Sequence, residues 1–149
     1  MFEGKMIIFS GPSGSGKSTL SRYLLNKYEL FEFSVSACTR NIREGEIDGK
    51  DYYFISEEEF KNRININSFI EWEEVYKGNF YGTLISELRR IWDKKKHVLF
   101  DVDVIGAINI KKQFPEKTLS ILIKPPSLDS LRNRLQKRST EDNESINIR

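Results

Sequence analysis

The sequence predicts an α/β fold in which a parallel sheet lies between two layers of helices. Apolar runs typical of buried strands alternate with segments of helical periodicity over most of the 149 residues, and strands joined by helical crossovers pair in parallel. The first apolar run leads into the octapeptide GPSGSGKS at residues 11–18, and a helical pattern starts directly after it. A strand, a glycine-rich loop and a helix in that order form a phosphate-binding loop. The predicted three-layer sheet is therefore of the P-loop NTPase type.

The expected core elements follow from apolar periodicity and from helix start signals. We expect strands at residues 5–10, 33–35, 97–102 and 119–123, and helices at residues 17–27 and 105–113. A last helix starts after the Pro-Pro-Ser turn at residues 125–127, with Leu128, Leu131 and Leu135 on one face.

Residues 36–83 break this alternation. They carry turn signals at Glu44-Gly45, Asp48-Gly49 and Lys77-Gly78-Asn79, and a strand pattern at residues 52–54. One short helix begins with Ser56 and Glu59 in the spacing of a capping box. We interpret this stretch as a small mixed subdomain inserted into the α/β core.

The octapeptide predicts nucleotide binding. Backbone N–H groups of such a loop point inward and, together with the helix N-terminus, hold phosphate oxygens. Lys17 would reach the β- and γ-phosphates of a nucleoside triphosphate, and Ser18 would hold Mg²⁺. The candidate residues for binding ATP are Gly11, Pro12, Ser13, Gly14, Ser15, Gly16, Lys17, Ser18 and Thr19.

Acidic residues follow the third expected core strand. Asp101 stands where a Walker-B carboxylate would, at the carboxyl end of a parallel strand, which makes it a second candidate ligand for Mg²⁺. Asp103 follows two residues later and points the same way.

Several arginines are candidates for the charge that phosphoryl transfer needs, because that reaction spreads negative charge over the moving group. We interpret Arg132 as a surface residue. The candidate catalytic residues are Lys17, Arg40, Arg43, Arg134, Arg138 and Arg149.

Composition and charge argue against several classes of protein. The net charge of +2 results from 24 basic and 22 acidic residues, which is too small to indicate a nucleic-acid partner. No apolar run has transmembrane length, and the N-terminus lacks the layout of a signal peptide. The single cysteine excludes an internal disulfide and favours a reducing cytoplasm. We expect Cys38 to be a small buried residue and His97 to lie at a strand edge.

The sequence resembles the guanylate kinase family from Met6 to its last residue. The segments that carry the resemblance are GPSGSGKST, FSVSACTRNIREGEIDGKDYYF, FIEWEEVYKGNFYGT, FDVDVIG and LQKRSTEDNESINIR. The resemblance implies one domain over residues 1–149 that transfers a phosphoryl group from ATP to GMP with Mg²⁺. It implies a core at residues 1–35 and 84–137, a GMP-binding subdomain at 36–83 and a lid at 138–149.

The resemblance also implies roles for single residues. Matching positions grip the GMP phosphate at Arg40, Arg43, Tyr52 and Tyr81, and contact guanine at Ser36, Glu71, Thr83 and Asp103. Arg134, Arg138 and Arg149 match arginines that close on the triphosphate, and Asp101 matches the acidic residue near the metal and the acceptor. Guanine chemistry agrees, because its adjacent N1–H and N2–H₂ donors suit one carboxylate such as Glu71, whereas adenine would present a lone pair. The acceptor is an anionic phosphate oxygen, so no general base is required.

Three departures from the family pattern qualify these expectations. Asn41-Ile42 replaces a residue and a proline between the paired arginines, and Ser139 stands where a glycine is common in the lid. The sequence ends at Arg149, so we expect the C-terminal core elements to be absent and the chain to be a fragment or a truncated product. The alternatives are a guanylate-kinase-like module that binds proteins, a catalytically impaired fragment, or a kinase for another nucleotide.

Overall fold

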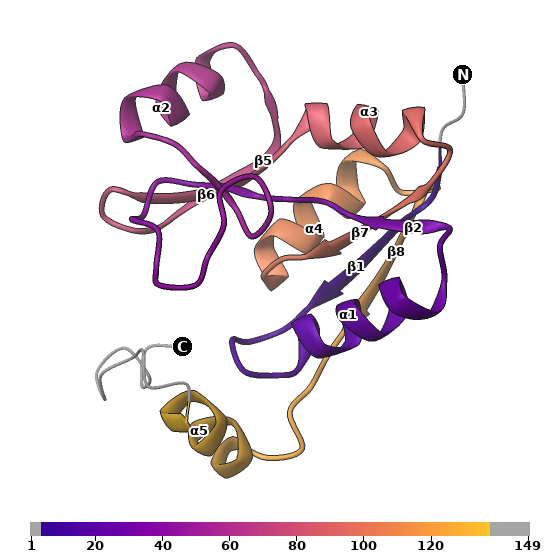
Figure 1. Ribbon diagram of the computed structural model, residues 1–149, viewed down its shortest axis with the longest axis vertical. Helices are drawn as coiled ribbons and strands as arrows, with labels where there is room; N and C mark the ends of the chain where they lie inside the picture. Colours follow the sequence, from indigo (N-terminus) through magenta and orange to yellow (C-terminus); the bar gives the residue numbers. More distant parts are fainter. Residues whose placement is uncertain (1–3, 138–149) are drawn as a thin grey trace.

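The core of the protein is a four-stranded sheet with the strand order β2-β7-β1-β8 (Figure 1). The computed structural model describes residues 4–137, so the expected lid at residues 138–149 lies outside the described residues. The strands are β1 (Met6–Ser10), β2 (Phe31–Phe33), β7 (His97–Asp101) and β8 (Thr118–Leu122). All of their pairings are parallel, which confirms the predicted fold class.

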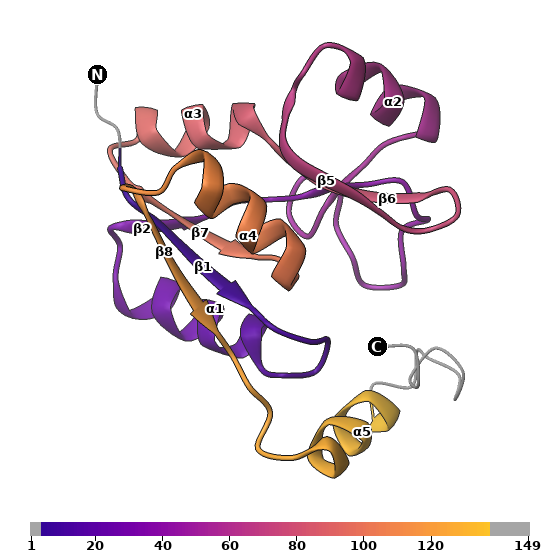
Figure 2. The same cartoon turned by 180° about the vertical axis from the view of Figure 1, so that it is seen from behind.

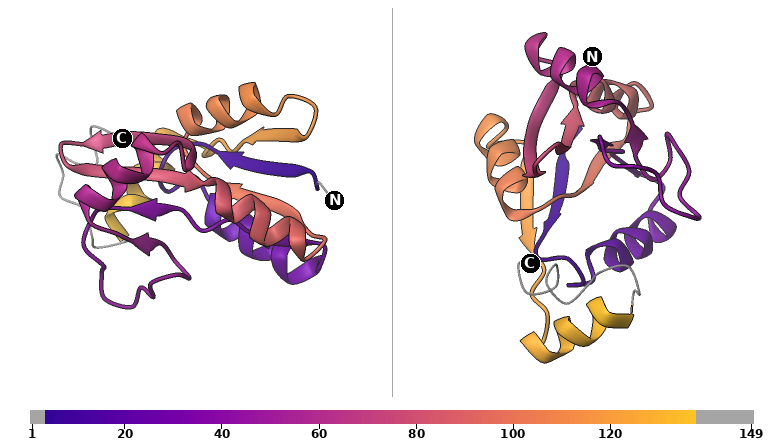
Figure 3. Two further views of the ribbon diagram at one scale, coloured as in Figure 1. Left: turned by 90° about the horizontal axis from the view of Figure 1, so that it is seen from above. Right: turned by 90° about the vertical axis from the view of Figure 1, so that its left-hand side faces the viewer.

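Helices cover both faces of this sheet. α1 (Lys17–Lys27) lies on one face, and α3 (Ile85–Asp93) and α4 (Val104–Gln113) lie on the other (Figure 1, Figure 3). The apolar runs of β1 and β7 form a hydrophobic core with side chains from α3 and α4, as expected for parallel strands that are buried on both faces. α5 (Leu128–Lys137) follows β8 and lies apart from these layers, beside the loop between β1 and α1 (Figure 2).

A second sheet, with the strand order β4-β3-β6-β5, stands on the side toward which β1 and β7 point. Its strands are β3 (Ala37–Cys38), β4 (Tyr53–Phe54), β5 (Phe69–Tyr76) and β6 (Asn79–Leu84). α2 (Glu57–Asn65) packs on it through Phe60, whose ring stacks on Phe69 with 4.3 Å between centroids. The predicted capping box begins α2, because the Ser56 hydroxyl accepts from the Glu59 N–H at 3.1 Å.

Several sequence-based predictions need correction. The second strand lies at Phe31–Phe33 rather than at residues 33–35, and its middle residue Glu32 is charged, which hid the strand pattern. The strand expected at residues 52–54 starts one residue later. Leu128 is 82% exposed rather than sharing the buried face of Leu131 and Leu135, because it is the first residue of α5. The helix α3 and the strands β3, β5 and β6 were not predicted.

The expectations for Cys38 and His97 are confirmed. Cys38 is fully buried in β3, and burial raises the pKa of its thiol to about 11, which keeps it protonated. His97 begins β7, and its Nδ1 accepts from the Lys5 N–H at 3.1 Å. Within residues 4–137, no helix is long and apolar enough to cross a membrane.

Candidate active site

The loop between β1 and α1 has the backbone conformation that a phosphate-binding loop requires. Gly11, Gly14 and Gly16 all have positive φ, at 143°, 81° and 107°. A Cβ at Gly11 would lie 2.4 Å from the carbonyl oxygen of Ile123, so a larger residue cannot replace it without moving the backbone. The loop ends at the first turn of α1, which begins at Lys17 and directs its N-terminal N–H groups into the loop.

Polar side chains of this loop face the end of β7. The Ser18 hydroxyl donates to Asp101 Oδ2 at 2.8 Å, and Lys17 Nζ lies 3.9 Å from Asp101 Oδ1. Lys17 Nζ also donates to the carbonyl oxygens of Gly11 and Pro12, at 2.8 Å and 3.1 Å. The pairing of Phe9 with Asp101 explains this, because it places the ends of the neighbouring strands β1 and β7 side by side. The structure thus brings together the predicted loop lysine, serine and Walker-B aspartate.

The last described helix contacts the same loop. Arg134 Nη1 donates to the carbonyl oxygens of Gly14 and Ser15, each at 3.3 Å. Leu131 and Leu135 are buried, and their side chains lie within van der Waals distance of a Cβ placed on Gly14. Arg132 is exposed, as expected. The other two candidate arginines of this region, Arg138 and Arg149, lie outside the described residues.

Arg40 follows β3 of the second sheet, and its guanidinium contacts a carboxylate and an aromatic ring. Its guanidinium makes a bidentate ion pair with Glu46, at 2.5 Å and 2.7 Å. It also lies over the Tyr52 ring, 4.9 Å from its centroid, and the Tyr52 and Tyr81 rings are 6.0 Å apart. The predicted phosphate-gripping residues Arg40, Tyr52 and Tyr81 therefore lie together, whereas the side chain of Arg43 is exposed.

Sequence reasoning missed Glu46, which organises this group. Besides Arg40, it accepts a hydrogen bond from the Arg43 backbone N–H at 2.8 Å. The bonds from Arg40 hold the pKa of the Glu46 carboxyl well below its usual range. The spacing of Arg43 and Glu46 is that of a tight turn, which is the signal that could have revealed this contact.

The four predicted guanine-contacting residues lie on β5, β6 and the loops beside β3 and α4. Thr83 Oγ1 donates to Glu71 Oε1 at 2.6 Å, and Asp103 caps α4 by accepting from the Gly106 N–H at 2.7 Å. A Cβ on Gly106 would lie 3.0 Å from Glu71 Oε2 and 3.2 Å from Asp103 Oδ1, so both carboxylates border the same small space. Burial raises the pKa of Glu71. Ser36 accepts from the Tyr53 N–H through its backbone carbonyl, at 2.9 Å.

Comparison with known proteins identifies the family. The guanylate kinase family model matches residues 3–149. The chain belongs to the guanylate kinase family. It is 52% identical over 146 residues to the guanylate kinase of Porphyromonas gingivalis, with 97% of this chain and 78% of that protein covered. It is 47% identical over 149 residues to that of Clostridium tetani, covering 100% of this chain and 70% of that protein. The crystal structure of guanylate kinase from Anaplasma phagocytophilum superposes with a TM-score of 0.76 at 39% identity, covering 91% of this chain and 68% of that chain.

A third carboxyl group lies in the expected guanine region, and sequence reasoning missed it. Glu73 lies two residues from Glu71 on β5, so both side chains project from one face of the strand. The neighbouring Asp103 carboxyl group, burial and the Glu71 charge together raise the pKa of Glu73 to about 7. Glu73 Oε2 is buried without a hydrogen-bond partner among the described residues. We infer that Glu73 and Asp103 share a proton, and the alternation Glu71–Trp72–Glu73 was the available signal.

We expect the pH dependence of stability to report this proton. Between pH 4.5, the ordinary carboxyl pKa, and about 7, the folded chain retains the Glu73 proton that the unfolded chain releases. The free energy of unfolding should therefore fall as pH rises through that window. Urea unfolding of Glu73→Gln at several pH values should show a weaker decline than wild type. The exposed Glu58→Gln on α2 is the control, and a wild-type slope in Glu73→Gln would contradict the shared proton.

Proposed function

We propose that this chain transfers the γ-phosphoryl group of ATP to GMP, giving ADP and GDP. One observation carries the proposal: residues at and just after the end of β7 contact both the phosphate-binding loop and the space beside Glu71. Asp101 bonds Ser18 of the phosphate-binding loop, and Asp103, two residues on, borders the same space as Glu71. Ligands of parallel α/β sheets bind at the carboxyl ends of the strands, so both nucleotides would meet there.

The donor half consists of the loop at residues 11–19. We propose that Lys17 exchanges its bonds to the carbonyl oxygens of the loop for bonds to the β- and γ-phosphates. Arg134, already at the loop, would add positive charge on the other side of the moving group, as would Arg138 and Arg149. The catalytic task is to hold two anions together, and fixed cations lower its barrier without a general base.

The acceptor half would bind GMP at two ends. Arg40, Arg43, Tyr52 and Tyr81 would bind its phosphate, with the Glu46 pair fixing the orientation of the Arg40 guanidinium. Glu71 would accept from guanine N1–H and N2–H₂, with Thr83 fixing its orientation. Asp103 and Ser36 would contact the ring from either side. We propose the corresponding division into a core at residues 1–35 and 84–137, a GMP-binding subdomain at 36–83 and a lid at 138–149.

Mg²⁺ fits the donor half. Ser18 and Asp101 place a hydroxyl and a carboxylate oxygen 2.8 Å apart, and Mg²⁺ binds with few protein ligands plus waters and nucleotide phosphates. The described residues contain no cluster of three or more acidic, His or Cys side chains that could hold a metal ion. The bound ion would neutralise phosphate charge.

We place this activity in the cytoplasm, without nucleic-acid or membrane partners.

A nucleotide assay tests the proposal. With the 149-residue chain, ADP release coupled to NADH oxidation should be far faster with GMP than with AMP, CMP or UMP. Equal rates with GMP and AMP would contradict the choice of acceptor. ATP with Mg²⁺ should also raise the unfolding temperature, because a ligand that binds only the folded state stabilises it. Absence of stabilisation by ATP would contradict the proposed donor site and favour the alternatives, a protein-binding module or a catalytically impaired fragment.

A further inference from the structure

Glu87 is a buried carboxylate to which neither half of the proposed site assigns a role. It lies in the first turn of α3 and is 2% exposed. Its Oε2 accepts from the Val35 N–H and from Arg90 Nη2, both at 2.8 Å. Its Oε1 accepts from the Tyr53 hydroxyl at 2.9 Å and from Arg90 Nε at 2.8 Å. Burial alone would raise the pKa of Glu87, but these bonds outweigh burial and lower it, so the buried carboxylate stays ionised.

The donors around Glu87 come from both connections between the two sheets. Val35 lies on the chain that leaves β2 for β3, and α3 itself starts where the chain returns from β6. Tyr53 belongs to β4 of the second sheet. The Glu87 carboxylate therefore links three segments: the connection from β2 to β3, the helix α3 that follows β6, and the strand β4.

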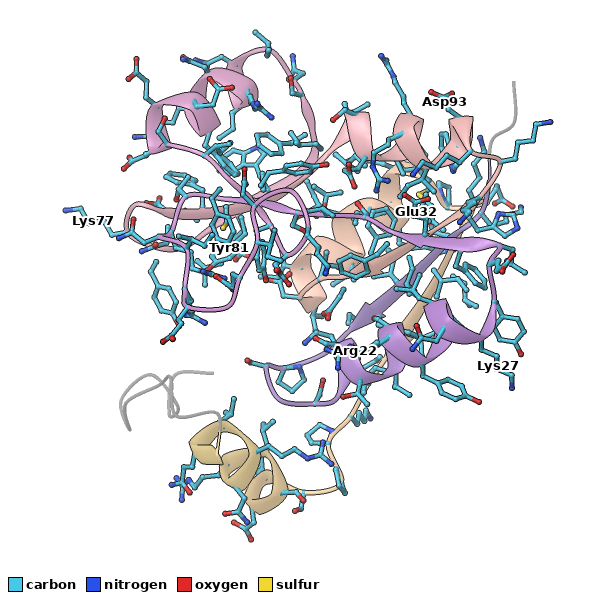
Figure 4. All side chains as sticks on the ribbon, in the orientation of Figure 1. Arg22, Lys27, Glu32, Lys77, Tyr81 and Asp93 are labelled. Atoms are coloured by element: carbon cyan, nitrogen blue, oxygen red, sulfur yellow. The ribbon has the colours of Figure 1, made fainter. Side chains whose placement is uncertain are left out.

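Arg90 anchors that point to the core sheet. It forms an ion pair with Glu32 of β2 and donates to the Phe33 carbonyl oxygen at 3.0 Å. Lys94 also reaches Glu32, at 2.7 Å. Figure 4 shows Glu32 between β2 and α3, while Tyr81 lies apart on the second sheet (Figure 4). Glu87 is thus fixed to the core on one side and holds the second sheet on the other.

The residues that Glu87 binds are the chain neighbours of two candidate GMP contacts. Val35 precedes Ser36, and Tyr53 follows Tyr52, whose ring lies under the Arg40 guanidinium. The Tyr53 N–H also donates to the Ser36 carbonyl oxygen at 2.9 Å. We infer that Glu87 is a positioning residue for the GMP site, acting through Val35 on Ser36 and through Tyr53 on Tyr52. This inference rests on the proposed function.

The variant Tyr53→Phe tests the inference with the smallest change. It removes the hydroxyl that Glu87 binds and keeps the ring. The KM for GMP should rise about fivefold to tenfold, less than the full worth of a hydrogen bond to a charged group, because Tyr53 acts on the GMP site only through Tyr52. The KM for ATP should stay at its wild-type value. Tyr23→Phe on α1 is the matched control, since that ring is 60% exposed and remote from the second sheet.

The variant Glu87→Gln tests whether Tyr53 acts through the carboxylate. If it does, Tyr53→Phe should raise the KM for GMP by a smaller factor in a Glu87→Gln background than in wild type, because the amide oxygen of Gln accepts from the Tyr53 hydroxyl more weakly than the carboxylate does. Calorimetric titration with GMP measures the same change as a dissociation constant, and thermal unfolding identifies variants that have lost their fold. An unchanged KM for GMP in Tyr53→Phe, or equal rises for GMP and ATP, would overturn the inference. A wild-type chain that neither binds nor phosphorylates GMP would instead contradict the proposed function itself.

Discussion

Replacing Lys17 by methionine is expected to lower kcat for phosphoryl transfer about 10³-fold. Methionine keeps an unbranched stem but removes the ammonium group that would follow the β- and γ-phosphates into the transition state. This ammonium group donates to the carbonyl oxygens of Gly11 and Pro12, at 2.8 Å and 3.1 Å, which place it at the N-terminus of α1. Steady-state rates at saturating ATP and GMP measure the effect.

Lys27→Met is the matched control for this experiment. Lys27 ends the same helix, is exposed, and contacts Tyr23 rather than the loop. Its kcat should equal that of wild type. A Lys17→Met variant that is folded and retains more than about a tenth of the wild-type kcat would contradict the role of Lys17 in transition-state stabilisation. Thermal unfolding of both variants separates this outcome from a loss of structure.

The phosphate-binding loop and its flanking elements could be predicted because their signals are local. Glycines, a lysine and a serine in fixed spacing specify the loop, and helix α1 has the predicted bounds, Lys17–Lys27. The strand β7 and the helix α4 were found within one residue at each end for the same reason, since apolar runs and periodicity survive without tertiary contacts.

Elements that depend on distant partners escaped prediction. The strand β3 has only two residues, and its pairing with β4 and β6 is what makes it a strand. Glu32 occupies the middle of β2 because Arg90 and Lys94 neutralise it. Glu87 is buried in α3 for a related reason, its four donors coming from three segments. A sequence shows such charges as surface residues, because the partners that make burial possible are far along the chain.

The candidate site also contains residues that could be predicted from the sequence and residues that could not. The resemblance gave Glu71, Thr83 and Asp103, and the structure places the first two in hydrogen-bond contact and the third beside them. It did not give Glu46 or Glu73. Glu46 pairs with Arg40, and Glu73 lies close to Asp103 only in the folded chain. Local motifs thus name the groups that would touch substrate, while the residues that hold those groups emerge from packing.

Glu71→Gln is expected to lower kcat/KM for GMP about 10²-fold to 10³-fold and to bring the preference for GMP over AMP down by a similar factor. One carboxylate oxygen is already engaged by the Thr83 hydroxyl at 2.6 Å, and the other faces the space beside Gly106 and Asp103. Guanine offers two adjacent donors to this group. An amide in its place supplies one acceptor and one donor, so an N–H would face an N–H and a buried donor would be left unpaired.

The comparison of nucleotides makes this test specific to base recognition. AMP presents a lone pair at N1, so its kcat/KM should not fall in Glu71→Gln, and the two substrates should respond in opposite or unequal ways. Glu74→Gln is the control on the same strand, because Glu74 is exposed and binds the Gly78 N–H at 2.8 Å. Equal losses for GMP and AMP in a folded Glu71→Gln variant would mean that Glu71 supports the site without reading the base. An unchanged preference would indicate a kinase that selects its acceptor elsewhere.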